Sequence, residues 1–302
     1  MTAPLKDTMQ EEIDKYGLEI NKVYNEDCLI GMKKIKDKSI DMILCDLPYG
    51  TTQCKWDSII PLNDYIEVEV KKKLVSMNQG DYKIHCFDNN ISSDEFKSNW
   101  KKHFKKGLWS HYNRIIKDNG AIVLTSAQPF TSVLIDSNIK NFKYTWIWNK
   151  NKATGHLNAK KQPLRSHEEI VVFYKKPCIY NPQGTIEGVF NSMRPAKGNQ
   201  RGEVYGQQRN DYGHSTVGNY PKTTISFPVP HKPIHPTQKP TELFDYLINT
   251  YTNEGDVVLD NCIGSGTTAI SSINTNRKYI GYELNQEYYA QTRKRINDRL
   301  NL

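Results

Sequence analysis

The sequence predicts an α/β protein built on a doubly wound, mostly parallel sheet. Four short apolar runs end where polar or Gly/Pro-containing loops begin, as buried parallel strands do: residues 40–45, 121–125, 257–259 and 279–282. Segments with helical spacing lie between these runs, and we expect helices over residues 108–117 and 241–251. Strands that alternate with helices in this way are typical of doubly wound sheets.

The chain length of 302 residues fits one catalytic domain with an appendage, and we expect a single domain over residues 1–302. Two segments interrupt the strand and helix alternation. Residues 63–107 are rich in lysine and predict an inserted lobe. Residues 177–232 are crowded with Gly, Asn, Gln, Tyr, Arg and Pro, and their interleaved aromatic residues favour a loop-rich recognition region over a disordered linker.

The composition limits the classes of partner and location. Lysine and arginine outnumber the acids by 41 to 33, and the net charge of +8 favours a polyanionic partner without identifying it. The apolar runs are too short to cross a bilayer and the N-terminus lacks a secretory pattern, so we expect a cytoplasmic protein without a membrane anchor. The six cysteines form no Cys-x-x-Cys pair, which indicates neither a zinc site nor a disulfide framework, and we expect no metal.

A glycine-rich segment follows the strand predicted at residues 257–259. It reads Asp-Asn-Cys-Ile-Gly-Ser-Gly-Thr-Thr-Ala over residues 260–269. Glycines permit a tight turn and a close approach of the backbone to a ligand, and free N–H groups at a helix start attract an anion such as an amino-acid carboxylate. Glu283 follows Gly264 by 19 residues at the end of the next strand, where a carboxylate can hold both ribose hydroxyls. This pattern alone describes a dinucleotide-binding dehydrogenase equally well.

A second motif, Asp46-Leu47-Pro48-Tyr49, follows the strand predicted at residues 40–45, at the sheet edge where α/β proteins bind ligands. An amine conjugated to a purine or pyrimidine ring is a poor nucleophile, so a catalyst must draw its nitrogen towards tetrahedral geometry. The Asp46 carboxylate and the Leu47 backbone carbonyl can each accept one N–H. Pro48 stiffens the turn and Tyr49 offers a stacking face. Taken by itself, the motif also fits a capping Asp beside a core Tyr.

Together the two motifs resemble those of the amino-methyltransferase family of DNA enzymes, Asp-Pro-Pro-Tyr and Asp-Pro-Phe-x-Gly-Ser-Gly-Thr-Thr. The catalytic turn precedes the cofactor loop, as in the beta-class arrangement. Further segments are similar to the family pattern at residues 25–29 (Asn-Glu-Asp-Cys-Leu), 126–130 (Ser-Ala-Gln-Pro-Phe), 165–168 (Arg-Ser-His-Glu) and, most specifically, 235–240 (His-Pro-Thr-Gln-Lys-Pro). The resemblance implies a seven-stranded, Rossmann-like methyltransferase sheet and S-adenosylmethionine as the methyl donor.

The resemblance also assigns residues to the cofactor site. It implies that S-adenosylmethionine is bound by Asp27, Cys28, Asp46, His235, Lys239, Asp260, Gly264, Ser265, Gly266, Thr267 and Glu283. Two departures from the family pattern have consequences. Leu47 replaces the usual first proline, which we expect to be tolerated because that position acts through its backbone carbonyl. Asn261 and Cys262 replace Pro-Phe, and the loss of an aromatic wall predicts weaker cofactor binding.

The substrate implied by the resemblance is double-stranded DNA, with the target base flipped into a pocket floored by residues 46–49. Family members with Asp at the first catalytic position mostly methylate N6 of adenine, so Asp46 indicates adenine, with N4 of cytosine as the alternative. We expect residues 177–232 to read the sequence and a basic set to contact DNA: Lys150, Lys152, Lys160, Lys161 and Arg165.

Two other classes of protein remain as alternatives from the sequence alone. A nicotinamide-dependent oxidoreductase would leave residues 46–49 and 235–240 without a role. A catalytically silent DNA-binding module would leave the intact Asp46, Pro48 and Tyr49 unexplained. A homodimer, a cognate restriction endonuclease, and a bacterial or phage origin stay open as expectations from the resemblance.

Overall fold

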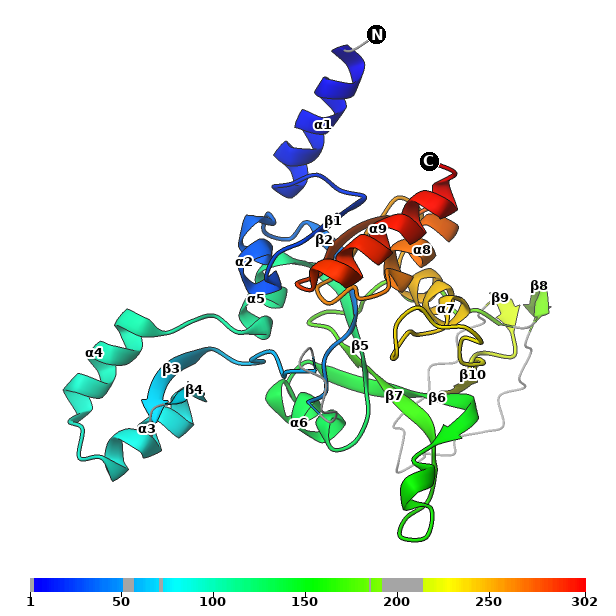
Figure 1. Cartoon of the computed structure of the whole chain (residues 1–302). Helices are drawn as coiled ribbons and strands as arrows, with labels where there is room; N and C mark the ends of the chain where they lie inside the picture. Colours follow the sequence, from blue (N-terminus) through cyan, green and yellow to red (C-terminus); the bar gives the residue numbers. More distant parts are fainter. Residues whose placement is uncertain (1–2, 51–56, 71–72, 185, 192–213) are drawn as a thin grey trace, which may run out of the picture.

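The computed structural model describes residues 3–50, 57–70, 73–184, 186–191 and 214–302. Its centre is an eight-stranded sheet (Figure 1), whose strands lie in the order β1 (Lys22–Tyr24), β12 (Lys278–Tyr282), β11 (Val257–Asp260), β2 (Ile40–Asp46), β5 (Ile116–Ser126), β7 (Arg165–Phe173), β6 (Phe142–Thr154) and β10 (Thr224–Ser226). Within this sheet β7 runs antiparallel to both neighbours, and the other pairs are parallel. The predicted α/β fold with a mostly parallel sheet is therefore confirmed. The sheet has eight strands where seven were expected, and the strands at its two edges, β1 and β10, have three residues each.

The four strands predicted from apolar runs correspond to β2, β5, β11 and β12. Helix α7 (Thr241–Tyr251) covers the predicted residues. The other predicted helix is shorter than expected, since α5 (Leu108–Ile115) ends before Lys117 and β5 begins at Ile116. The reason is sheet pairing: Ile116 lies beside Ile40 of β2, so the chain has already joined the sheet at this point.

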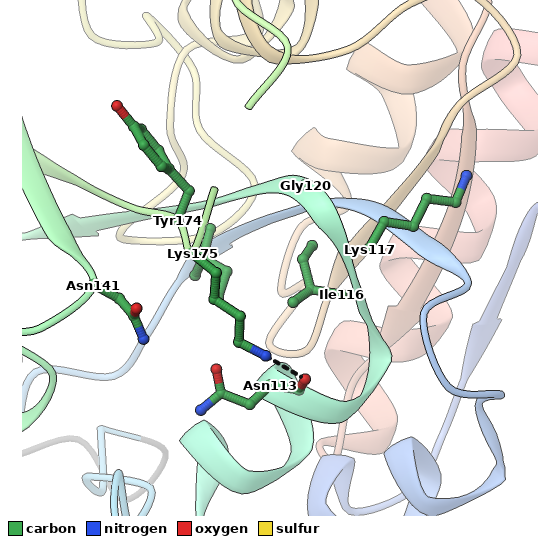
Figure 2. A pocket seen from close by; sticks show the side chains of 8 residues that line it. Asn113, Ile116, Lys117, Gly120, Asn141, Tyr174 and Lys175 are labelled. Carbon is green, nitrogen blue, oxygen red and sulfur yellow. Dashed lines mark hydrogen bonds between the residues drawn. The ribbon is translucent and has the colours of Figure 1, made fainter. Parts of the chain in front are cut away.

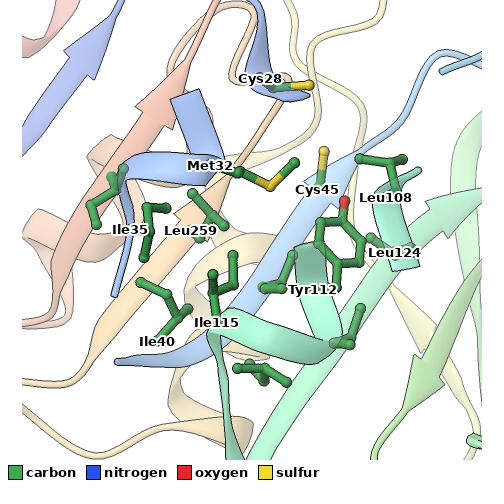
Figure 3. Close-up of a cluster of buried hydrophobic side chains, with 14 of the residues drawn as sticks. Cys28, Met32, Ile35, Ile40, Cys45, Leu108, Tyr112, Ile115, Leu124 and Leu259 are labelled. Atoms are coloured by element: carbon green, nitrogen blue, oxygen red, sulfur yellow. The ribbon is translucent and has the colours of Figure 1, made fainter. Parts of the chain in front are cut away.

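Helices cover both faces of the sheet, because successive residues of a strand point to opposite faces. Ile43 and Cys45 of β2 pack in a cluster with α2 (Cys28–Gly31), η1 (Met32–Lys34), α5 and α6 (Phe130–Ser137). Figure 3 shows part of this cluster, with Cys45 near Met32 and Tyr112. Met42 and Leu44 point to the other face, where α7 packs. Helices α8 (Thr267–Asn274) and α9 (Gln286–Leu300) enclose a third cluster beside β1 and β12.

The segment expected to form an inserted lobe lies beside the central sheet (Figure 1). It contains the antiparallel pair β3 (Tyr65–Val70) and β4 (Lys73–Asn78), then α3 (Gln79–Asp88) and α4 (Ser93–His103). The lobe has its own apolar cluster around Ile66, Tyr82 and Cys86. Its two ends meet, because the Leu108 N–H bonds to the Pro61 carbonyl at 2.9 Å. Helix α1 (Ala3–Tyr16) precedes the sheet.

Strands β6 and β7 form a long antiparallel hairpin with η2 (His156–Asn158) near its tip. Part of the expected recognition region lies outside the described residues, namely 185 and 192–213. On either side of that gap, β8 (Ile186–Asn191) and β9 (His214–Gly218) pair in a separate antiparallel sheet. No helix among the described residues is both long enough and apolar enough to cross a membrane.

Candidate active site

A cavity of about 1050 Å³ opens where β2, β11 and β12 end. The C-terminal ends of parallel strands lie at the same edge of the sheet, so segments far apart in sequence meet here. The cavity is lined by all four predicted catalytic residues and by most of the predicted cofactor residues: Asp27, Cys28, Asp46, Leu47, Pro48, Tyr49, His235, Lys239, Asp260, Gly264, Ser265, Thr267 and Glu283. Lys150 and Lys152 also line it. Gly266, Lys160, Lys161 and Arg165 are not part of this lining.

The Asp46 carboxylate, at the end of β2, is held through both oxygens. Its Oδ1 accepts hydrogen bonds from the Tyr49 hydroxyl at 2.8 Å and from the Thr125 hydroxyl. Its Oδ2 accepts one from Lys239 Nζ at 2.6 Å. Thr125 can reach because β5 pairs with β2 in a register that places it opposite Asp46. The sequence does not predict Thr125 as a site residue, since only the sheet register brings it here.

The Tyr49 ring is fixed beside the carboxylate. It stacks on Phe130 at the start of α6, with ring centroids 5.4 Å apart, and Lys239 Nζ lies 5.7 Å from its centroid. Burial raises the pKa of Tyr49 well above its usual value, so its hydroxyl is a neutral donor to Asp46 at neutral pH. Residues 126–130 resemble the family pattern in sequence, but the role of Phe130 as a stacking partner emerges only from the fold.

Four charged side chains form a connected set in one wall of the cavity. Lys239 Nζ lies 3.4 Å from Glu168 Oε2, and Lys150 Nζ lies 3.1 Å from Glu168 Oε1. The side chains of both lysines are only 7% exposed. Burial in this wall opposes the charge on Glu168, but the two lysines outweigh it and the pKa of Glu168 is lowered. Burial also opposes the charge on Lys239, yet Asp46 and Glu168 outweigh it and the pKa of Lys239 is raised.

The environment of Lys150 bears on its expected role as a DNA contact. Its ammonium is enclosed and paired with Glu168, which favours a role inside the site over one at a phosphate. Lys152, Lys160, Lys161 and Arg165, by contrast, are exposed on the β6–β7 hairpin. In the sequence, Glu168 is only one member of a segment that matches the family pattern, and nothing there assigns it a role.

The glycine loop joins β11 to α8 through left-handed backbone at Gly264 (φ 49°) and Gly266 (φ 79°). A Cβ on Gly266 would lie 2.7 Å from Thr292 Cγ2 of α9, so a glycine is required there. The Gly264 N–H donates to Glu283 Oε2 at 3.0 Å, and the Asn285 N–H donates to Glu283 Oε1 at 2.8 Å. Burial raises the pKa of Glu283. Its carboxylate is thereby fixed at the edge of the cavity, at the end of β12.

Asp260 and Asn261 hold the loop from inside. The Asp260 carboxylate accepts hydrogen bonds from the Cys262 N–H at 3.0 Å and from the Thr268 hydroxyl. Burial raises the pKa of Asp260 to about 6. The Asn261 side-chain oxygen accepts a hydrogen bond from the buried Tyr112 hydroxyl of α5. Asn261 and Cys262 stand where the family pattern has Pro-Phe. In place of an aromatic ring, the loop therefore has an amide that is hydrogen-bonded to Tyr112 and a thiol.

His235 and Asp27 complete the cavity lining from two further segments. The His235 ring meets Tyr288 of α9 edge-on, with centroids 4.3 Å apart, and its Nδ1 accepts the Thr237 N–H at 3.3 Å. Burial lowers the pKa of His235, which favours the neutral ring. Asp27 caps α2 by accepting the Leu29 N–H at 2.7 Å. The described residues contain no group of three or more His, Cys, Asp or Glu side chains placed to hold a metal ion.

A second, much smaller cavity lies between β5 and the chain after β7 (Figure 2). Its volume is about 10 Å³, room for about one water molecule. Its lining includes Lys175, whose Nζ donates to the Asn113 carbonyl at 2.8 Å. Because of its size, this cavity is not a candidate for a substrate or cofactor.

Comparison with known proteins identifies the family of this chain. Residues 40–294 match the family model N6_N4_Mtase, described as DNA methylase. The DNA adenine methyltransferase YhdJ of Escherichia coli (strain K12) is 25% identical over 299 residues, covering 95% of this chain and 86% of that protein. The crystal structure of the M1.HpyAVI–SAM complex has a TM-score of 0.52 and 20% identity, covering 91% of this chain and 98% of that one.

The structure of PvuII DNA methyltransferase (cytosine-N4-specific) has a TM-score of 0.54 and 14% identity, covering 93% of this chain and 91% of that one. These two structures establish a shared fold. A nicotinamide-dependent oxidoreductase, which the glycine loop by itself left open, has no support from the family match. Because the family model spans most of the sequence, this chain belongs to the N6_N4_Mtase family of DNA methylases.

Proposed function

We propose that this protein transfers a methyl group from S-adenosylmethionine to N6 of an adenine that has been flipped out of double-stranded DNA. One observation supports the proposal above all: the turn at residues 46–49 and the glycine loop with Glu283 line the same cavity. A nucleophile held at the turn therefore lies in the same space as a methyl donor held at the loop, and transfer requires alignment of the two.

The cavity fits S-adenosylmethionine together with a base. Its volume of about 1050 Å³ lies just above the usual range for small-molecule sites. The Glu283 oxygens accept the Gly264 and Asn285 N–H groups and keep lone pairs for a ribose hydroxyl. Gly264, Ser265 and Thr267 line the wall at the start of α8, and His235 lines the same cavity. When bound, S-adenosylmethionine would supply an electrophilic methyl group on a sulfonium sulfur.

The residues of the turn would prepare the amine for attack. The Asp46 carboxylate and the Leu47 carbonyl each accept one N–H, which draws the nitrogen towards tetrahedral geometry. The Tyr49 ring, held by Phe130, lines the cavity beside Asp46 and can contact the base there. Asp46 is also placed to receive the proton that the nitrogen loses. The charge that develops on the nitrogen lies beside a fixed carboxylate, which is the arrangement that lowers a barrier most effectively.

Adenine is the proposed base because Asp46 stands at the first catalytic position, and YhdJ is named a DNA adenine methyltransferase. N4 of cytosine is the second candidate, since the fold is also shared with a cytosine-N4-specific enzyme. Both reactions methylate an exocyclic amine, and the accepting groups of residues 46–49 serve either one.

We assign DNA binding to the exposed cations of the β6–β7 hairpin: Lys152, Lys160, Lys161 and Arg165. Cations on a projecting hairpin can reach the phosphates on both sides of a flipped base. Sequence recognition is assigned to residues 177–232. A homodimer and a cognate restriction endonuclease are proposals derived from the family resemblance. A cytoplasmic location is a proposal derived from the sequence.

The test is the transfer of labelled methyl from S-adenosylmethionine to mixed genomic DNA, followed by nucleoside analysis. We expect N6-methyladenine, and we expect Asp46→Ala to reduce its formation by about 10³-fold. Asp37→Asn is the matched control, because Asp37 is 72% exposed and pairs at the surface with Arg114. A product of N4-methylcytosine would move the assignment to the second candidate. DNA that stays unlabelled despite cofactor binding would contradict the proposal.

A further inference from the structure

Most of the acceptor sites on Asp46 are already in use. A carboxylate offers about four lone-pair sites, and among the residues that the structure describes three donors bond to Asp46: Tyr49, Thr125 and Lys239. The first two share Oδ1, whereas Lys239 is alone on Oδ2. Oδ2 is therefore the oxygen that a target amine can approach, and Lys239 competes for it.

Lys239 has a second carboxylate within reach. Its Nζ lies 3.4 Å from Glu168 Oε2, beyond the usual length of a charge-assisted hydrogen bond. That oxygen is buried, and among the described residues it forms no hydrogen bond. A buried carboxylate oxygen without a donor is costly, so Glu168 Oε2 is a ready acceptor for the ammonium. The other Glu168 oxygen is held by Lys150 at 3.1 Å, which fixes the carboxylate in place.

We propose that Glu168 is a positioning residue that takes Lys239 from Asp46 when the target amine binds, an inference that rests on the proposed function. The ammonium turns from a bond of 2.6 Å at Asp46 Oδ2 towards Glu168 Oε2. Asp46 Oδ2 then accepts an N–H of the amine, and Lys239 remains paired with a carboxylate throughout. Lys150 balances the charge of Glu168, so the wall stays neutral in both arrangements.

The charged and titratable groups around Lys239 come from several elements. Asp46 and Tyr49 face it from the end of β2, Glu168 faces it from β7, and His235 lies nearby in the preceding loop. Lys150 of β6 lies beyond Glu168. If Glu168 loses its charge, Asp46 is the only carboxylate within the described part of the chain that is left to Lys239, and the Lys150 charge is unbalanced. The amine must then break the Lys239–Asp46 ion pair without a second carboxylate that accepts Lys239.

The variant that isolates this role is Glu168→Gln, which keeps the shape and removes the charge. We expect its single-turnover rate of methyl transfer near pH 7 to fall about 10- to 100-fold, with DNA and cofactor affinities within about threefold of wild type. At about pH 9.5 the deficit should shrink, because Lys239 without Glu168 loses its proton more easily and a neutral amine releases Asp46. Glu168→Asp should recover part of the rate.

Glu169→Gln is the matched control, since Glu169 is the next residue of β7 and bonds instead to the Thr131 hydroxyl at 3.1 Å. Its rate should stay within about twofold of wild type. Thermal unfolding of each variant shows whether a lower rate results from misfolding or from the loss of the Glu168 charge. If Glu168→Gln does not fold, the rate of Glu168→Asp is compared with that of wild type instead. A Glu168→Gln deficit that is equal at both pH values, or no larger than that of Glu169→Gln, overturns the assignment.

The outcome for wild type distinguishes this inference from the proposed function. Methylation of DNA by the wild-type chain, together with an unimpaired Glu168→Gln variant, overturns only the role of Glu168. Failure of the wild-type chain to methylate any DNA overturns the proposed function, and this inference with it.

Discussion

Glu283 and Gly264 are joined by a hydrogen bond of 3.0 Å, from the glycine N–H to Glu283 Oε2. This bond ties the end of β12 to the tight turn after β11. The carboxylate that is proposed to hold the ribose is therefore also the group that fixes the shape of the glycine loop. Cofactor binding and loop geometry depend on the same side chain.

Glu283→Ala should weaken S-adenosylmethionine binding by about 2 to 3 kcal/mol, or about 30- to 150-fold in Kd, because hydrogen bonds to a charged acceptor are lost. Isothermal titration with the cofactor measures the change. Glu287→Ala is the control, since Glu287 lies exposed in the first turn of α9. Equal affinities for wild type and Glu283→Ala would exclude a role for Glu283 in the cofactor site.

Gly266→Ala should destabilise the fold by about 2 to 4 kcal/mol. Its φ of 79° is left-handed, and the added Cβ would lie 2.7 Å from Thr292 Cγ2. Gly255→Ala is a control for backbone strain alone, because its φ is 81° and an added Cβ would meet no atom within 4 Å. We expect it to cost about 1 kcal/mol. Urea unfolding measures both, and equal losses would show that the contact with Thr292 contributes nothing.

The double variant Lys160→Ala, Lys161→Ala should weaken DNA binding and reduce the slope of log affinity against log salt concentration by about 1 to 2. Both lysines are exposed near the tip of the β6–β7 hairpin. Binding measured by fluorescence anisotropy at several salt concentrations gives the slope. Arg293→Ala with Lys294→Ala is the control, because it removes the same charge from the exposed side of α9. A slope identical to wild type would rule out phosphate contacts at the hairpin tip.

Asp260 should make the fold less stable as the pH rises from about 4 to about 6. Burial raises its pKa to about 6, above the ordinary value near 3.9 for an unfolded chain. The folded state therefore binds more protons than the unfolded state in this window, and stability falls with rising pH. The loss attributable to this group is of the order of 2 to 3 kcal/mol.

Asp260→Asn removes that titration. The difference in the free energy of unfolding, wild type minus Asp260→Asn, should decline between about pH 4 and about pH 6 and then stay level. Urea unfolding at several pH values gives the comparison, in which contributions from other carboxylates cancel. A constant difference between the two proteins across this window would mean that Asp260 is not protonated more readily in the folded state.

Much of the fold could be predicted because its central strands are continuous apolar runs. β2 and β11 are buried on both faces, and such strands are readable without knowledge of their partners. β1 and β10 have three residues each, too few for a pattern, and they exist because a neighbouring strand offers a free edge. The early end of α5 likewise depends on the pairing of Ile116 with Ile40.

The site was predictable where its residues lie within one continuous motif, as at residues 46–49 and in the glycine loop. Residues brought in by strand register were not. Thr125 reaches Asp46 because β5 pairs with β2. Glu168 meets Lys150 because β6 and β7 form a hairpin. A lysine in a basic chain is usually solvated, so nothing in the sequence set Lys150 apart from its exposed neighbours.

The lobe begins and ends at one place. Where the chain leaves it, the Leu108 N–H bonds to the Pro61 carbonyl and the Trp109 N–H bonds to the Leu62 carbonyl, at 2.9 and 3.0 Å. The connection from β2 to β5 is consequently independent of the length of the inserted segment. The entropic cost of closing such a segment grows only slowly with its length. In evolutionary terms, this segment can be gained, lost or exchanged without rethreading the sheet.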